Sequence, residues 1–173
     1  MTPKEQIAHA INVFGLALNL QEAVVSQRVT PSTFKKHLII ETGGKGITFQ
    51  HNYTQEDLRI HSKNLMFMAL GTTAIIIDTV LDHSLGSKDP NDTSETGSTR
   101  AIIYMIRCAF AHNMAFPVWS CKTKYQRKYT VNLPRTGTII FDAASLNRQL
   151  IKMEHIGGLE AYAELIERCT TLV

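Results

Sequence analysis

The chain has 173 residues, with 44% hydrophobic and 19% charged side chains and a formal net charge of +3 at pH 7. This profile is typical of one soluble globular domain and excludes wholesale disorder. A chain of this length buries roughly two-thirds of its unfolded surface, so it folds without metal or disulfide cross-links.

The first predicted element is a long amphipathic helix from Pro3 to about Arg28. Proline and then Glu5 suit a helix start, and apolar residues follow at three- and four-residue steps. A second, shorter helix is predicted from Ser32 to about Ile40, followed by a turn at 43–46. Ile47 to Gln50 is either a short strand or a loop.

A long helix is predicted from Thr54, whose hydroxyl caps it, to about His83. Its apolar stretch from Leu65 to Leu81 is 17 residues long and is interrupted by Gly71 and Asp78, among others. A membrane span needs about 20 cleaner residues, so the stretch is interpreted as a buried bundle helix. The N-terminus has no secretory profile, and we expect a cytoplasmic protein without a membrane partner.

Residues 86–98 are interpreted as a surface loop without core residues. Ser98 or Thr99 then caps a third main helix. Short β-rich runs at 117–122, 128–133 and 138–141 predict a hairpin or three-stranded insert. Asp142 is expected to cap a helix carrying Leu146, Leu150 and Ile151, and the glycine pair Gly157–Gly158 precedes a closing helix.

These elements predict a mostly α fold: a helical bundle of four to five main helices with a small β insert after the third. We expect one domain over residues 1–173. Its helical core covers about 3–83 and 98–113, the β insert about 115–141, and the C-terminal helices about 142–172.

The charge is unevenly distributed along the chain. The segment from 97 to 141 has seven basic residues and no acidic one, whereas the other 128 residues have 11 basic and 15 acidic side chains. Such a segment is what a phosphate-binding face needs, unless its charges scatter over several sides of the fold.

Arg107 and His112 stand near the end of the third helix, shortly before Pro117. A spacing of five rotates the two side chains by about 140° on a regular helix, so one helix cannot aim both at one point. Either the helix ends between them, or two subunits bring their copies together.

The string IRCAFAHN, with its Arg-x4-His spacing at a helix end, resembles the HEPN superfamily. The resemblance covers the motif helix well and the bundle plan loosely. It implies a homodimer whose motifs face each other, and metal-independent RNA cleavage in which the RNA 2′-hydroxyl attacks the adjacent phosphate. It also suggests a defence or toxin–antitoxin setting, with an antitoxin or another protein as partner.

The residues suit that chemistry. An imidazole such as that of His112 accepts or returns a proton near neutral pH, and the fork of Arg107 matches phosphate oxygens. Asn113 could orient either group. Two departures from the family pattern are Cys108, where members often carry a polar residue, and Met114, where some toxins carry tyrosine. In the structural alternative, Arg107 bridges helix ends and His112 caps the helix C-terminus.

A second candidate region, rich in cations and aromatic rings, follows the motif. Its cations can hold phosphates, and its aromatic rings can stack on unpaired bases at roughly 1–3 kcal/mol each. Equally, it could be a solvated hairpin tip. The candidate RNA-binding residues are Trp119, Lys122, Lys124, Tyr125, Arg127 and Lys128.

Asp78 and Asp82 lie four apart on the buried helix, so both can face Arg107 or His112 and support them. A metal pair is the alternative, but the Glu-x-x-His motifs of bundle di-metal sites are missing. The three cysteines are widely spaced and form no CxxC pair. We therefore predict no metal site and no cofactor.

The sequence thus predicts a dimeric HEPN-like endoribonuclease that acts on RNA. Two other functions stay open. One is a non-catalytic HEPN module that binds RNA, a nucleotide or a protein partner, and the other is a purely structural dimerisation domain.

Overall fold

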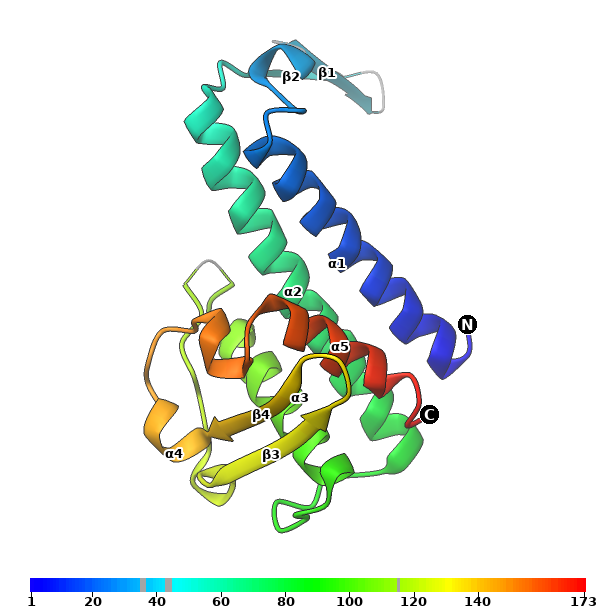
Figure 1. Ribbon diagram of the computed structural model, residues 1–173. Helices are drawn as coiled ribbons and strands as arrows, with labels where there is room; N and C mark the ends of the chain where they lie inside the picture. The colour runs from blue at the N-terminus through cyan, green and yellow to red at the C-terminus, as the bar shows by residue number, and fades with distance from the viewer. Residues whose placement is uncertain (35–36, 43–44, 115) are drawn as a thin grey trace. The chain divides into compact units, whose positions relative to one another are not determined.

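The computed structural model describes residues 1–34, 37–42, 45–114 and 116–173 (Figure 1). Packing divides the chain into two compact units. The large unit consists of residues 1–15 and 67–173, and the small unit of residues 16–66. The helices α1 (Pro3–Val25) and α2 (Gln55–Leu85) each contribute residues to both.

In the small unit, the end of α1 is followed by the short 3-10 helix η1 (Pro31–Thr33) and an antiparallel hairpin. Its strands β1 (His37–Thr42) and β2 (Lys45–Gln50) pair His37 with Gln50 and Thr42 with Lys45. The predicted helix over 32–40 is therefore wrong. The run is too short to offset helix nucleation, and the β-branched pair Ile39–Ile40 favours a strand. The turn predicted at Gly43–Gly44 lies outside the described residues.

The start of α2 is fixed by a reciprocal cap, as the sequence predicts. The backbone N–H of Asp57 donates to Thr54 Oγ1 at 3.1 Å, and Asp57 Oδ2 accepts from the Thr54 backbone at 2.8 Å. Further along, Ser62 Oγ lies 2.5 Å from Gln21 Oε1, and the Gln55 amide donates to Val24 O at 3.0 Å. These contacts pack α2 against α1 within the small unit.

The large unit is built around α3 (Glu95–His112), whose buried side carries most of its apolar residues. Ser94 caps the helix by accepting a hydrogen bond from Gly97 N at 3.0 Å, with Glu95 in the first turn. The helix thus begins a turn earlier than the Ser98 or Thr99 cap predicted from sequence. Those two residues are instead buried, at 4% and 0% exposure.

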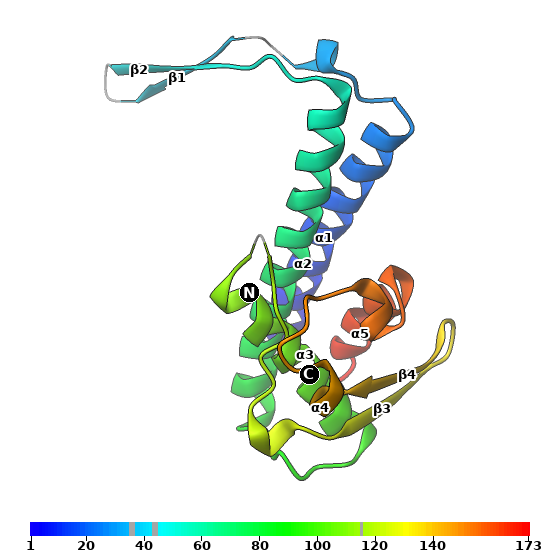
Figure 2. The same ribbon diagram turned by 90° about the vertical axis from the view of Figure 1, so that its left-hand side faces the viewer.

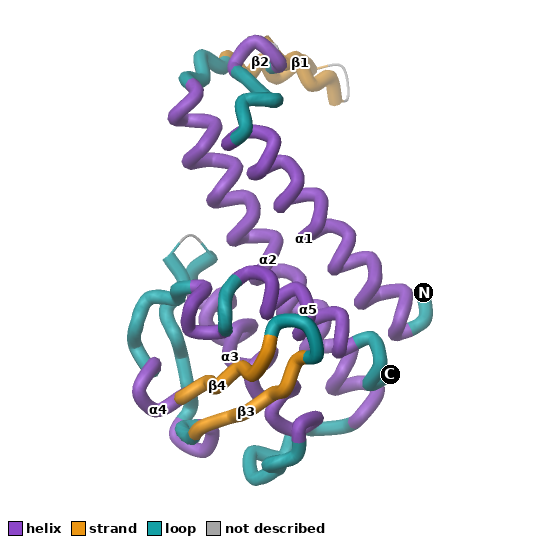
Figure 3. Tube along the Cα trace, viewed as in Figure 1, coloured by secondary structure: helices purple, strands orange, loops and turns teal. Residues whose placement is uncertain are grey.

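A single hairpin follows α3, made of β3 (Lys128–Leu133) and β4 (Gly137–Asp142) and packed against α3 (Figure 3). On β3 buried and exposed positions alternate, with Tyr129, Val131 and Leu133 inside. The hairpin is confirmed. Of the predicted third run, the described residues form only the isolated bridge between Val118 and Leu150.

The C-terminal region consists of the one-turn helix α4 (Ala143–Leu146), the 3-10 helix η3 (Met153–Ile156) and α5 (Leu159–Cys169) (Figure 2). Asp142 caps α4 by accepting from Ser145 N at 3.2 Å, as predicted, but the helix stops at Leu146 instead of continuing to Ile151. On α5, the fully buried Tyr162 donates its hydroxyl to Leu70 O of α2 at 3.0 Å.

Among the described residues the fold is therefore mostly helical, with the four main helices α1, α2, α3 and α5 and a two-stranded hairpin after the third. This confirms the predicted fold class.

By length and composition, α2 is the one described helix that could cross a membrane, and 56% of its apolar window is buried within the protein. Burial to this degree also fits the core helix of a soluble fold.

Candidate functional site

The helix α3 presents Arg107 and His112 to solvent while the residues between them are mostly buried. The Arg107 side chain is 44% exposed, and His112 is exposed as the last residue of the helix. Cys108, Ala109 and Phe110 are buried between them. The motif therefore lies at the surface of the large unit.

The helix continues without a break from Glu95 through His112. The angle between the two side chains thus stays at about 140°, and the rise between them is about 7.5 Å. Of the two predicted routes by which they could meet, a helix end between them is excluded. The other route, in which two copies of the chain bring the pair together, stays a prediction.

Asn113 follows directly after the helix and is exposed. Its side-chain Oδ1 accepts a hydrogen bond from the backbone N–H of Phe116 at 3.0 Å. This bond ties Asn113, at the end of α3, to Phe116 and is distinct from the orienting role predicted for Asn113.

Asp78 and Asp82 of α2 both bind one buried lysine. Lys88, whose side chain is only 8% exposed, donates to Asp78 Oδ1 at 2.8 Å and to both carboxylate oxygens of Asp82 at 2.6 Å. Arg100 adds a contact to Asp82 at 3.1 Å. Lys88 belongs to the segment interpreted from sequence as a loop without core residues. That interpretation is wrong at this position.

Asp78 also reaches the motif. Its Oδ2 lies 3.9 Å from Arg107 Nε, whereas Asp82 makes its contacts with Lys88 and Arg100. The pKa of Asp78 is raised, because burial outweighs the opposing hydrogen bond and charge of Lys88. Arg107 makes one further long contact, at 4.0 Å to Cys108 Sγ. Long contacts leave the guanidinium with donors for an anionic ligand.

Tyr104, one turn before Arg107, joins this network to the basic segment. The ammonium of Lys88 lies 4.8 Å from its ring centroid, and that of Lys122 lies 5.9 Å away. Burial and a hydrogen bond with Cys108 raise the pKa of Tyr104 to about 12, so the phenol stays neutral. Sequence reasoning missed both Tyr104 and Lys88. Tyr104 could have been found from its three-residue spacing to Arg107.

The predicted RNA-binding residues fall into two groups. Lys122, Lys124 and Lys128 are exposed, with Lys128 near Asp142 at 3.9 Å. Arg127 is half-buried and donates to Asp92 O at 2.8 Å. The cations of this region are thus partly available to a phosphate backbone.

The two aromatic residues of the set are core residues. Trp119 is 1% exposed and donates its indole N–H to His155 Nδ1 at 2.8 Å, and Tyr125 is 4% exposed. Their rings are covered by protein, so the predicted base stacking on Trp119 and Tyr125 is not available in this structure. A ring that packs into the core beneath a hairpin cannot also stack on a base.

The described residues contain no group of three or more His, Cys, Asp or Glu side chains that could hold a metal ion. The three cysteines are free and buried. Burial raises the pKa of Cys121 to about 11 and that of Cys169 to about 12, which keeps both thiols protonated.

No protein-family model, no curated protein and no solved structure matches this chain. Any functional conclusion therefore depends on the residues themselves.

Proposed function

We propose that this protein is a metal-independent endoribonuclease of the HEPN type, active as a homodimer. The observation that carries the proposal is the position of Arg107. Among the described residues, this half-exposed guanidinium makes only long protein contacts. It lies one turn from Tyr104, where the basic segment contributes Lys122. A guanidinium with donors to spare suits phosphate recognition.

In the proposed reaction, the 2′-hydroxyl of the RNA attacks the adjacent phosphorus. The O2′–P bond forms and the P–O5′ bond breaks, which gives a 2′,3′-cyclic phosphate and a free 5′-hydroxyl. His112 accepts the proton of the 2′-hydroxyl and returns a proton to the leaving oxygen. Arg107 stabilises the negative charge that develops on the phosphate oxygens.

Because α3 is continuous, we infer that Arg107 of one copy acts with His112 of the other. The exposed lysines Lys122, Lys124 and Lys128 hold the RNA backbone on either side of the cut. The suggested defence or toxin–antitoxin setting stays a prediction from the resemblance.

The test is incubation of the purified protein with mixed RNA in excess chelator. Wild type should cleave, and His112→Ala and Arg107→Lys should each lose about 10²-fold or more in rate, because the proton carrier or the bidentate fork is gone. His9→Ala, an exposed histidine on α1, is the matched control and should cleave normally. Product ends are identified by mass spectrometry. Equal cleavage by wild type and His112→Ala would refute the proposal.

A non-catalytic RNA-binding module is the second candidate, and the unbroken helix α3 favours it, because Arg107 and His112 of one chain then form no catalytic pair. It predicts RNA binding without cleavage. Replacing Lys122, Lys124 and Lys128 by alanine should then lower the slope of log affinity against log salt by about 2, since each backbone contact to a single strand contributes about 0.7.

A further inference from the structure

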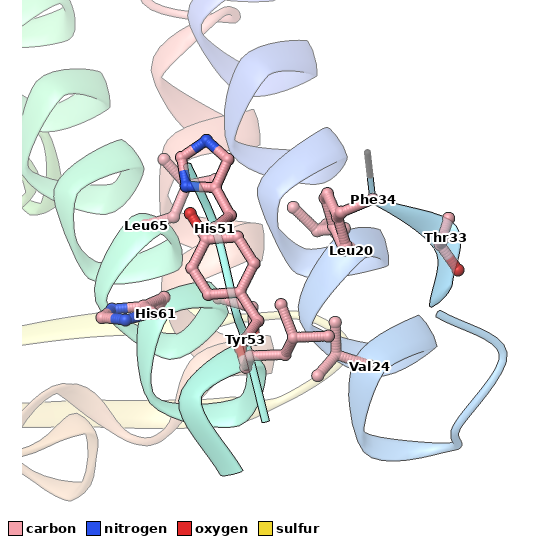
Figure 4. Close-up of a pocket in the computed structure, with 10 residues that line it drawn as sticks. Leu20, Val24, Thr33, Phe34, His51, Tyr53, His61 and Leu65 are labelled. Atoms are coloured by element: carbon pink, nitrogen blue, oxygen red, sulfur yellow. Dashed lines mark hydrogen bonds between the residues drawn. The ribbon is translucent and has the colours of Figure 1, made fainter. Parts of the chain in front are cut away.

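The small unit contains a cavity of about 360 Å³, which we call the aromatic cavity (Figure 4). It uses no residue of the Arg107–His112 motif. Its size falls in the range of about 300–1,000 Å³ that small-molecule pockets occupy. The lining residues are Leu20, Val24, Thr33, Phe34, His51, Tyr53, Leu58, His61, Ser62 and Leu65.

One side of the cavity is made of rings arranged around Tyr53. The His51 ring stacks on Tyr53 with 5.0 Å between centroids and 10° between planes. Phe34 and His61 meet Tyr53 edge-on, each at 5.9 Å. Figure 4 shows His51 and Tyr53 side by side in front of the α2 residue Leu65. Such rings offer both a flat face and edges to an aromatic guest.

The other side is aliphatic and comes from the two helices. Val24 of α1 is 1% exposed and Leu58 of α2 is 5% exposed, so both are fixed parts of the wall. Phe34 and Leu65 line the cavity and are 40% and 46% exposed, so we infer that it opens to solvent beside them. An apolar guest could enter between them and lose its contact with water, which drives binding.

None of the described residues that line the cavity is Asp, Glu, Lys or Arg, and its two titratable residues are His51 and His61. At a pH above the range in which histidine titrates, a charged guest would lose its hydration without gaining a partner of fixed charge, which is costly. The Ser62 hydroxyl is already engaged, at 2.6 Å from Leu58 O and 2.5 Å from Gln21 Oε1. The Thr33 hydroxyl accepts from Thr30 N at 3.2 Å but can still donate its own proton. It and the Tyr53 hydroxyl can serve one or two polar atoms of a guest.

We propose that the aromatic cavity binds a small, neutral aromatic molecule of one or two rings. The rings around Tyr53 select for flatness, and a described lining without Asp, Glu, Lys or Arg selects against ions. This site is separate from the candidate nuclease site, so it can be occupied whether or not the protein cleaves RNA.

The probe is Prodan, a neutral naphthalene ketone with two rings, whose emission shifts to shorter wavelength in apolar surroundings. It is titrated into the full chain, and indole, the anion indole acetate and the neutral aliphatic cyclohexanol are then added as competitors. We expect one probe per chain, displaced by indole and at least tenfold less well by indole acetate or cyclohexanol. A probe that does not bind, or that all three competitors displace equally, would overturn the proposal.

Two variants locate the site. Leu65→Trp places a large ring at the cavity mouth and should weaken probe binding at least tenfold. Ile60→Trp is the matched control, because Ile60 is on the same helix, is 48% exposed and does not line the cavity. Circular dichroism checks that both variants fold. Equal binding by both variants would contradict the assignment. Probe binding should also persist at concentrations where sedimentation shows that the chain self-associates. Loss of binding there would contradict the assignment, because a second copy of the chain would then cover the cavity.

Discussion

Glu164 of α5 is a buried carboxylate that holds the turn between β3 and β4. Its Oε1 accepts from Arg135 N at 2.9 Å, and its Oε2 accepts from the backbone N–H and the hydroxyl of Thr136 at 2.9 and 2.7 Å. Burial alone raises the pKa of Glu164, but these hydrogen bonds and the Arg135 charge outweigh it, so the pKa is lowered.

Replacing Glu164 by glutamine should therefore lower the free energy of unfolding at neutral pH. A carboxylate whose pKa is lowered by folding contributes stability above its unfolded pKa and loses it as pH falls through the folded value. The difference between wild type and Glu164→Gln should then shrink below about pH 4.5, as measured by urea unfolding. Glu160→Gln, an exposed glutamate on α5, serves as control. A difference that is constant with pH would contradict the assignment.

At the motif, the sequence is enough to single out Arg107 and His112, because spacing and helix position are local properties. The network that Arg107 joins through Asp78 could not be predicted in the same way. Lys88 comes from a polar loop, and its burial between Asp78 and Asp82 depends on how that loop folds back. Trp119 is equally ambiguous, since a ring among cations suits RNA stacking or core packing alike, and only tertiary contacts with Phe141 and His155 decide.

Among the elements, the close approach of α2 to α3 depends on Gly71. A methyl group added there would lie 2.4 Å from Phe110 Cδ1, far inside van der Waals contact. Gly71→Ala should therefore lower the free energy of unfolding by about 1–3 kcal/mol through overpacking, despite the better helix propensity of alanine. Gly15→Ala, on α1 with nothing within 4 Å, should instead raise it by about 0.5–1 kcal/mol. Thermal unfolding of the two variants checks both, and equal shifts would contradict this packing.

Lys88 ties the segment after α2 to both α2 and α3, through Asp78, Asp82 and the Tyr104 ring. Lys88→Met should lower the free energy of unfolding by about 3 kcal/mol, which is at the low end for breaking a buried ion pair. The loss stays at the low end because Asp82 is 41% exposed and keeps its contact with Arg100. The loss should be smaller at acid pH. Folding raises the pKa of Asp78. Below the folded pKa the neutral acid predominates, and as the pH rises above it the buried carboxylate destabilises the folded state.

Adding Asp78→Asn to Lys88→Met should recover part of the loss, since the uncompensated buried charge is then removed. Denaturant unfolding of the wild type, both single variants and the double variant gives the coupling energy. A purely additive cycle would mean that Lys88 and Asp78 do not interact as the structure places them.

The long helices α1, α2 and α3 could be predicted because many residues repeat one apolar period, so a single misread position changes little. The segment 32–40 has too few residues for that averaging, and strand pairing with 45–50 decides it. Similarly, α4 stops at Leu146 because the following residues pair with 117–119, where Arg148 N donates to Trp119 O at 2.9 Å. Contacts that join distant parts of the chain are not encoded in a local pattern.

For the whole molecule, the unbroken α3 has a consequence for assembly. One chain cannot direct Arg107 and His112 at the same phosphate, because the helix separates them by about 140°. Under the proposed function, a twofold dimer provides two composite sites, each with the arginine of one copy and the histidine of the other. The chain should therefore sediment as a dimer at concentrations where it cleaves RNA.

Composite sites predict complementation between two inactive variants. When Arg107→Ala and His112→Ala proteins are mixed and allowed to exchange subunits, half of the dimers become heterodimers. In each heterodimer, one of the two composite sites has both an intact arginine and an intact histidine. Cleavage should then return to about a quarter of the wild-type rate, although neither variant cleaves alone. Native mass spectrometry of one variant with a mass tag verifies the exchange. Full exchange without recovered cleavage would exclude a site shared in this way, because an intact arginine and an intact histidine would be present in the same dimer and still fail to act together.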